Sequence, residues 1–240
     1  MEALLACYAA GGLGGEVMPE DANPHLPRGS AESYAYFTLP MALNYQRDSY
    51  ALWKGANQTY ADADTRKAFS PQSVQEMDLP TLQALLTTYK VALQPNRHPV
   101  IWKTLCDTFV SCFAGDIRNL FSDCGYSVRK VQLLLAKRKK QFPYLGGAKI
   151  SNYWLYVLTN YTDLALIDRE AITVAPDTHV IQASVRLGLL APEEAEGAAV
   201  QALVAGRWKA LLRGTDLQPI DLHTPLWLWS RGRLVTPVFS

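Results

Sequence analysis

Apolar residues recur at three- and four-residue intervals along most of the chain, which is the spacing of amphipathic helices. From Ser33 a dense apolar and aromatic run extends to Tyr45, and Pro40 predicts a break within it. No sustained alternation of apolar and polar residues occurs, so we expect an all-α fold. The pattern predicts further helices around residues 50–53, 81–91, 98–112, 117–120, 128–135, 149–158, 177–188, 192–208 and 221–228.

The beginning of the chain has a different composition. Residues 11–32 are rich in Gly, Pro, Asn and acidic side chains, which is typical of a loop or arm. Residues 1–15 are apolar and Gly-rich but lack a basic start, so they predict a short helix and loop and no signal peptide. We therefore expect an N-terminal arm over residues 1–32 and a helical domain over residues 33–240.

Composition narrows the classes of partner. The 23 basic and 22 acidic residues give a net charge of +1, so contact with a nucleic acid would need a local basic patch. No stretch of 18 apolar residues occurs, so we expect no membrane span. The four cysteines lack the C-x-x-C spacing of a metal site and predict reduced, mostly buried thiols in a cytoplasmic protein: Cys7, Cys106, Cys112 and Cys124.

Two residues carry the candidate chemistry, Lys149 and Asp177. Taken singly, each has an ordinary structural interpretation: Asp177 lies between Pro176 and Thr178 as a helix N-cap would, and a Lys at a helix start is usually solvated. Together they supply two functions. A carboxylate stabilises positive charge that develops on a sugar, and a desolvated Lys amine can attack the sugar carbon.

The residues before Lys149 favour contact with a phosphate backbone. Gly146 and Gly147 form a turn between helices, where backbone N–H groups and a helix N-terminus can bind phosphate without reading sequence. A cluster of four cations, which we call the basic run, directly precedes this turn. It indicates either a solvated helix end or further phosphate contacts, and it comprises Lys137, Arg138, Lys139 and Lys140.

These segments resemble the helix-hairpin-helix DNA glycosylases. The chain has Gly147-x-Lys149 followed by residues 176–179 (Pro-Asp-Thr-His), in the order of that superfamily. Residues 149–153 (Lys-Ile-Ser-Asn-Tyr) and 222–228 (Leu-His-Thr-Pro-Leu-Trp-Leu) resemble the archaeal 8-oxoguanine glycosylases of the Agog type. The resemblance covers roughly residues 140–232 and is weaker over 33–135. The first part of the hairpin and a long Lys-to-Asp connection depart from the superfamily pattern, as they do in the Agog type.

The resemblance implies a two-lobed, all-α fold with the active site between the lobes. It implies a helix-hairpin-helix at about residues 128–158, a catalytic Asp segment over 176–190, and Lys149 and Asp177 as catalytic residues. Trp227 corresponds to a Trp that stacks on the base, and His223 occupies the position of an acidic residue. The remaining residues that would line the base pocket are Pro176 and Asp221.

The same resemblance implies double-stranded DNA with a flipped base as the partner of a monomer. It requires no metal and no organic cofactor, since no Cys after Cys124 could hold the iron–sulfur cluster of some relatives. The default substrate is an oxidised purine. Alternatives are a hypermodified base of phage DNA, a free modified nucleoside, or DNA binding without catalysis, and the presence of both Lys149 and Asp177 argues against the last.

Overall fold

The protein is helical throughout the part of the chain that its computed structural model describes, residues 2–13 and 18–232. Within those residues, backbone pairing of the β type is limited to an isolated bridge between Ser127 and Ile167. The prediction of an all-α fold is therefore confirmed. The chain divides into two compact units, unit 1 (Met1–Met18 and Arg169–Ser240) and unit 2 (Pro19–Asp168).

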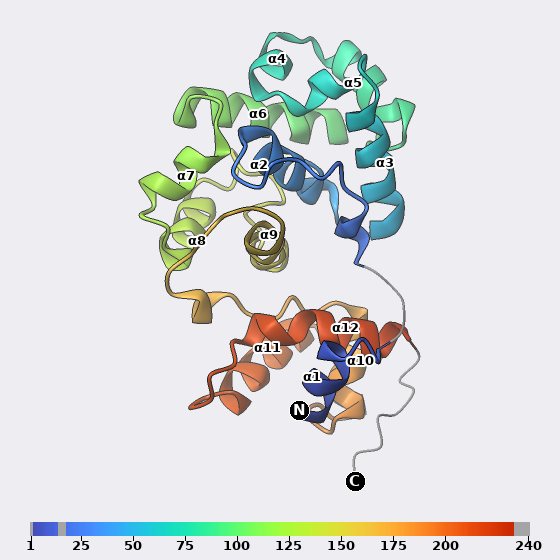
Figure 1. The fold of residues 1–240 in the computed structure, drawn as a ribbon, viewed down its shortest axis with the longest axis vertical. Helices are drawn as coiled ribbons and strands as arrows, with labels where there is room; N and C mark the ends of the chain where they lie inside the picture. Colours follow the sequence, from blue (N-terminus) through green and yellow to red (C-terminus); the bar gives the residue numbers. More distant parts are fainter. Residues whose placement is uncertain (1, 14–17, 233–240) are drawn as a thin grey trace. The chain divides into compact units, whose positions relative to one another are not determined.

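Unit 2 is built around aromatic side chains, with α9 packed against α2 (Figure 1). The buried aromatic residues of this unit include Tyr34, Tyr36, Phe37, Trp53 and Trp102. Its α-helices are α2 (Ala31–Thr38), α3 (Ser49–Ala61), α4 (Pro71–Glu76), α5 (Leu79–Thr88), α6 (His98–Phe113), α7 (Ile117–Asp123), α8 (Val128–Lys137) and α9 (Ala148–Tyr161).

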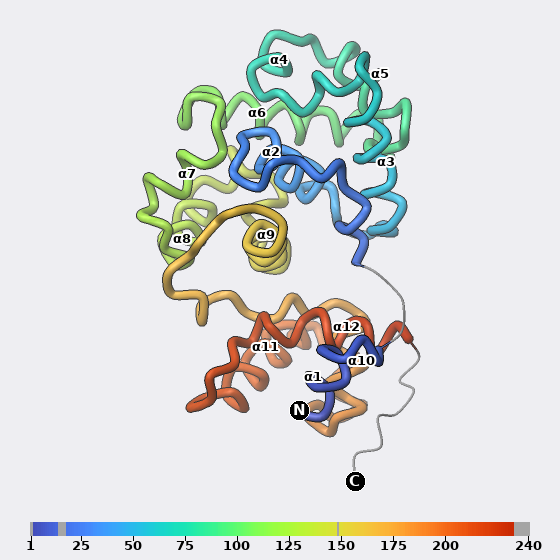
Figure 2. Tube along the Cα trace, in the orientation of Figure 1, coloured from blue at the N-terminus to red at the C-terminus, as the bar shows by residue number. Residues whose placement is uncertain are grey.

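Unit 1 joins the first helix of the chain to its last third. Helix α1 (Glu2–Ala9) lies against α12 (Figure 2), and its Leu4 is completely buried in the core of the unit. The short helix predicted near the N-terminus is thus present. The other α-helices of this unit are α10 (Thr178–Arg186), α11 (Val200–Leu211) and α12 (His223–Arg231).

Local sequence signals set the helix boundaries. Ser30, Asp48, Asp78 and Ser127 each accept a hydrogen bond from a backbone N–H in the first turn of the helix that follows, as N-cap residues do. Short 3-10 helices complete the connections. They are η1 (Pro19–Asp21), η2 (Pro40–Leu43), η3 (Arg66–Phe69), η4 (Arg169–Ala171), η5 (Pro192–Glu196) and η6 (Pro219–Leu222).

Pro40 acts as predicted, because α2 ends at Thr38 and a 3-10 helix begins at Pro40. The single helix predicted over 192–208 is wrong. It consists of η5 and α11, and Gly197 separates them with an extended backbone (φ −74°, ψ 145°). The helix predicted over 81–91 ends early, at Thr88, because Lys90 adopts a left-handed φ of 60°.

Among the residues described, no helix is both long and apolar enough to cross a lipid bilayer.

Candidate functional site

Asp177 lies at the start of α10 and uses both oxygens of its carboxylate. Oδ1 accepts the backbone N–H of Val180 at 2.9 Å, so the residue is the N-cap that the sequence predicts. Oδ2 accepts the indole N–H of Trp227 from α12 at 3.0 Å. The side chain is half-buried and has a fixed orientation, which is what an electrostatic catalyst requires.

Trp227 is held in place by its neighbours in unit 1. The ring of His179 meets its edge with 5.3 Å between ring centroids, and the Arg231 guanidinium lies 5.1 Å from the indole centroid. The His179 Nδ1 is in turn 3.4 Å from the Ser230 hydroxyl of α12. Arg231 therefore occupies one face of the indole ring.

The other predicted pocket residues of unit 1 lie close by in sequence but differ in environment. His223 is the first residue of α12, one turn before Trp227, and is buried with 3% of its surface exposed. Pro176 is buried directly before Asp177. Asp221 accepts the backbone N–H of Gln218 at 3.0 Å and lies 3.7 Å from Arg169, which gives it a structural role in η6.

Lys149 belongs to unit 2 and lies in the first turn of α9. Its side chain is exposed. The preceding hairpin is anchored at several points: Tyr144 has a left-handed φ of 60° and stacks on Tyr45 with centroids 4.1 Å apart, and Arg97 covers Tyr144 at 5.1 Å. The hydroxyl of Thr108 also donates to the Gln141 carbonyl at 3.1 Å. The hairpin directly before Lys149 is therefore held by contacts with other residues of unit 2.

The hairpin glycines do not themselves offer free donors. The N–H of Gly146 bonds to the Phe142 carbonyl and that of Gly147 to the Tyr144 carbonyl, both at 2.9 Å. Gly146 is needed for packing, since a Cβ there would lie 3.1 Å from the carbonyl oxygen of Leu135. Gly147 provides no side-chain cap, so the donors available to an anion are those of the first turn of α9.

The basic run lies where α8 ends at Lys137 and continues into the hairpin. All four side chains are exposed, and none forms an ion pair with another described residue. Cations at a helix C-terminus also interact favourably with the helix dipole. The location thus agrees with both interpretations that the sequence allows, a solvated helix end and a phosphate-binding surface.

Glu20 is a buried acid that no pattern in the sequence singles out. It lies in η1 of unit 2 with none of its surface exposed, and its Oε2 accepts the hydroxyl of Tyr153 at 3.0 Å. Its Oε1 is buried and accepts no hydrogen bond from any described residue. Burial raises the pKa of Glu20 from 4.5 to about 7, although hydrogen bonds, including that of Tyr153, oppose this shift.

We expect this burial to make stability depend on pH. Below pH 4.5 the carboxyl is protonated in both the folded and the unfolded chain, whereas between pH 4.5 and about 7 only the unfolded chain ionises. The free energy of unfolding should therefore fall across this window, by roughly 3 kcal/mol from this group. Glu20→Gln removes the ionisation, so the variant should gain stability relative to the wild type as pH rises.

Urea denaturation at pH values from 4 to 8.5 measures this difference. Glu32→Gln provides the control, since Glu32 is an exposed glutamate of the same unit. A difference between Glu20→Gln and wild type that stays constant over the whole range would contradict a buried, neutral Glu20.

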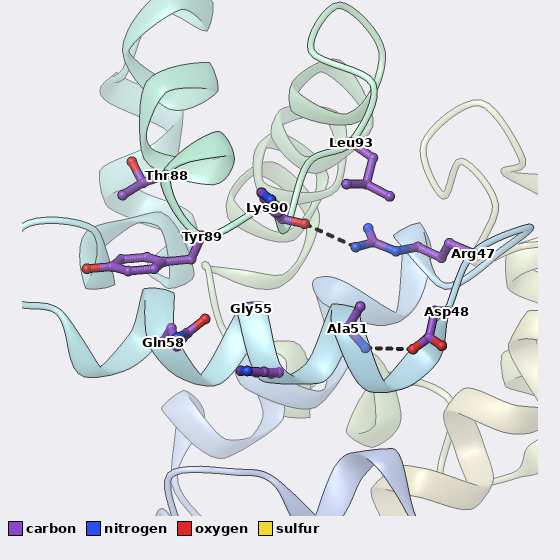
Figure 3. Close-up of a pocket in the computed structure, with 10 residues that line it drawn as sticks. Arg47, Asp48, Ala51, Gly55, Gln58, Thr88, Tyr89, Lys90 and Leu93 are labelled. Carbon is purple, nitrogen blue, oxygen red and sulfur yellow. Dashed lines mark hydrogen bonds between the residues drawn. The ribbon is translucent and has the colours of Figure 1, made fainter.

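Unit 2 also has an open pocket of about 400 Å³ between α3 and the segment after α5 (Figure 3). Arg47, Lys54 and Lys90 contribute its positive charge. The Arg47 guanidinium is fixed by the carbonyls of Val91 at 2.7 Å and Lys90 at 3.1 Å. None of the pocket or hairpin residues predicted from the sequence lines it.

Within the described ranges, no cluster of His, Cys, Asp and Glu has the geometry to hold a metal ion. All four cysteines are free thiols. Cys106 and Cys124 are buried, Cys7 is half-buried and Cys112 is exposed, so the expectation of mostly buried thiols holds for only half of them.

Comparison of the sequence with models of known protein families and with curated proteins finds no match to either. The resemblance to the helix-hairpin-helix glycosylases accordingly rests on the residues of the hairpin, the Asp177 segment and α12.

Proposed function

We propose that this protein is a DNA N-glycosylase of the helix-hairpin-helix type that excises a modified or damaged base. The observation that carries the proposal is the carboxylate of Asp177, which two N–H donors from different helices hold in one orientation. Such fixed charge is effective because no reorganisation is needed when positive charge develops in the transition state. Lys149 at the start of α9 supports the proposal as the matching nucleophile.

The proposed reaction divides the work between the two residues. The bond between C1′ and the base breaks with its electron pair leaving on the base, while Asp177 stabilises the positive charge on the sugar. The Lys149 amine bonds to C1′, and opening of the sugar ring converts the product to a Schiff base. Loss of the 3′ phosphate by β-elimination would then nick the strand. No metal or organic cofactor takes part.

Unit 2 would hold the DNA backbone in this proposal. The first-turn N–H groups of α9 suit a phosphate, and the exposed basic run lies at the same hairpin. The partner is double-stranded DNA, from which the target base must leave the stack before it can react. We expect the protein to act as a monomer.

Neutralising the basic run should weaken binding to every DNA sequence alike. Each lost phosphate contact should lower the slope of log affinity against log salt by about one unit. Fluorescence anisotropy with two unrelated duplexes at several salt concentrations measures both effects in a variant with all four residues changed to Gln. Changing Lys54 and Lys90 to Gln is the matched control elsewhere in unit 2. An unaltered slope in the first variant would assign the run to solvated surface.

Two classes of base are candidate substrates. By resemblance, the default substrate is an oxidised purine such as 8-oxoguanine. A hypermodified base of phage DNA is the second candidate, and His223 favours it, because a buried imidazole can donate a hydrogen bond where a carboxylate only accepts. In the second case the enzyme would serve in defence against phage.

Incubation with a panel of DNAs tests the proposal. The panel contains duplexes with oxidised purines, genomic DNA from phages with modified bases and free modified nucleosides, and mass spectrometry identifies the free bases released. Release of one base class confirms glycosylase activity and names the substrate. Binding without release from any DNA would leave a DNA-binding module, and release from free nucleosides alone would indicate a nucleosidase.

A further inference from the structure

The contact between Trp227 and Asp177 joins two helices whose residues are 50 positions apart. The donor is the N–H of the indole, at 3.0 Å from Oδ2, while the N-cap bond of Val180 occupies Oδ1 at 2.9 Å. An ionised carboxylate is an acceptor only, so it suits donors on both oxygens.

The indole has little freedom to choose another partner. Only 7% of Trp227 is exposed, and His179 and Arg231 pack against the ring. Ser230 links the helices a second time, because its hydroxyl contacts His179 at 3.4 Å and donates to the Gln182 amide oxygen at 3.1 Å. The packing between α10 and α12 thus determines where the indole N–H points.

We propose that Trp227 is a positioning residue, whose indole N–H keeps the Asp177 carboxylate directed at the reacting sugar. This role depends on the glycosylase activity proposed above. It differs from the stacking role that resemblance implies for the same residue, since stacking needs only the aromatic ring and positioning needs the N–H group.

Trp227→Phe separates the two roles, because Phe keeps a flat apolar ring and lacks the N–H. The single-turnover rate of base release should fall about 10- to 100-fold, as for loss of a hydrogen bond to a charged group. Affinity for substrate DNA should stay within about twofold, because the ring needed for stacking remains.

Trp208→Phe is the matched control. Trp208 is also buried in unit 1, and its indole N–H donates to the Ser184 hydroxyl at 2.9 Å, so this variant loses an equivalent hydrogen bond away from Asp177. It should lower stability and leave the single-turnover rate of base release unchanged. If Trp227→Phe does not fold, benzothienylalanine at position 227 replaces the N–H by sulfur and preserves the fused ring.

The indole proton provides a readout that does not depend on activity. In nitrogen-15 spectra, the Trp227 indole resonance should differ between the wild type and Asp177→Asn, because the variant removes the charged acceptor of the indole N–H. A resonance that is indifferent to Asp177→Asn would overturn the inference. So would a Trp227→Phe enzyme with the wild-type rate of base release, or one that loses DNA affinity alone, which would establish stacking. A wild-type protein that releases no base would instead overturn the glycosylase function. The indole resonance would still report the hydrogen bond between Trp227 and Asp177.

Discussion

Asp177→Asn should lose base release by on the order of a hundredfold or more while binding DNA almost as well as the wild type. The change removes the negative charge where positive charge develops, and groups of this kind contribute effects of that size. An Asn side chain can still accept the Val180 N–H as an N-cap, so the start of α10 should survive. Its amide cannot serve Trp227 equally well, because an NH2 group would face the indole N–H.

Single-turnover excision and anisotropy on the same duplex measure the two quantities. Asp78→Asn is the control, because Asp78 caps α5 in the same way, accepting the Thr81 N–H at 2.9 Å. It should change stability slightly and excision not at all. Excision at the wild-type rate by Asp177→Asn would show that Asp177 is only an N-cap.

Local features of the fold were predictable from the sequence. Apolar spacing located most of the helices, because residues three and four positions apart lie on the same side of a helix, and the Pro176-Asp177-Thr178 order marked a helix start. Errors occurred where backbone conformation interrupts a helical pattern of side chains. Lys90 and Gly197 are such places, because apolar spacing continues across them.

Features that depend on distant parts of the chain were not predictable. Leu4 lies in a segment expected to be an arm, yet the core that buries it comes from the last third of the sequence. Glu20 lies between Pro19 and Asp21 in a polar stretch, and its burial and its bond to Tyr153 arise only when η1 and α9 are brought together. The spacing of residues within a single helix cannot reveal either contact.

The candidate site shows the same division between local and distant contributions. Residue type and order identified Asp177 and Trp227 separately, but the hydrogen bond between them requires α10 and α12 to pack together. The structure was also needed to identify the hydrogen-bond donors of the hairpin. The sequence suggests that the N–H groups of Gly146 and Gly147 bind phosphate. In the structure these two groups bond to carbonyls within the turn, and the donors at the helix start belong to the first turn of α9.

Lys149 should form a covalent adduct with substrate DNA that borohydride traps, and Lys149→Gln should abolish the adduct. Borohydride reduces a Schiff base to a stable amine, so a protein–DNA band on a denaturing gel reports the intermediate directly. The exposed amine of Lys149 must lose water and its proton to attack C1′, and contact with bound DNA would provide that desolvation.

Lys140→Gln is the matched control, because Lys140 is an exposed lysine of the same hairpin. It should lower DNA affinity somewhat and keep the adduct, since it supplies charge to the backbone and no nucleophile. A wild-type protein that excises a base but yields no adduct would show that water attacks C1′. Lys149 would then act by its charge alone, strand nicking would be absent, and Asp177 would be the sole catalytic group, because stabilising the sugar cation does not require a covalent intermediate.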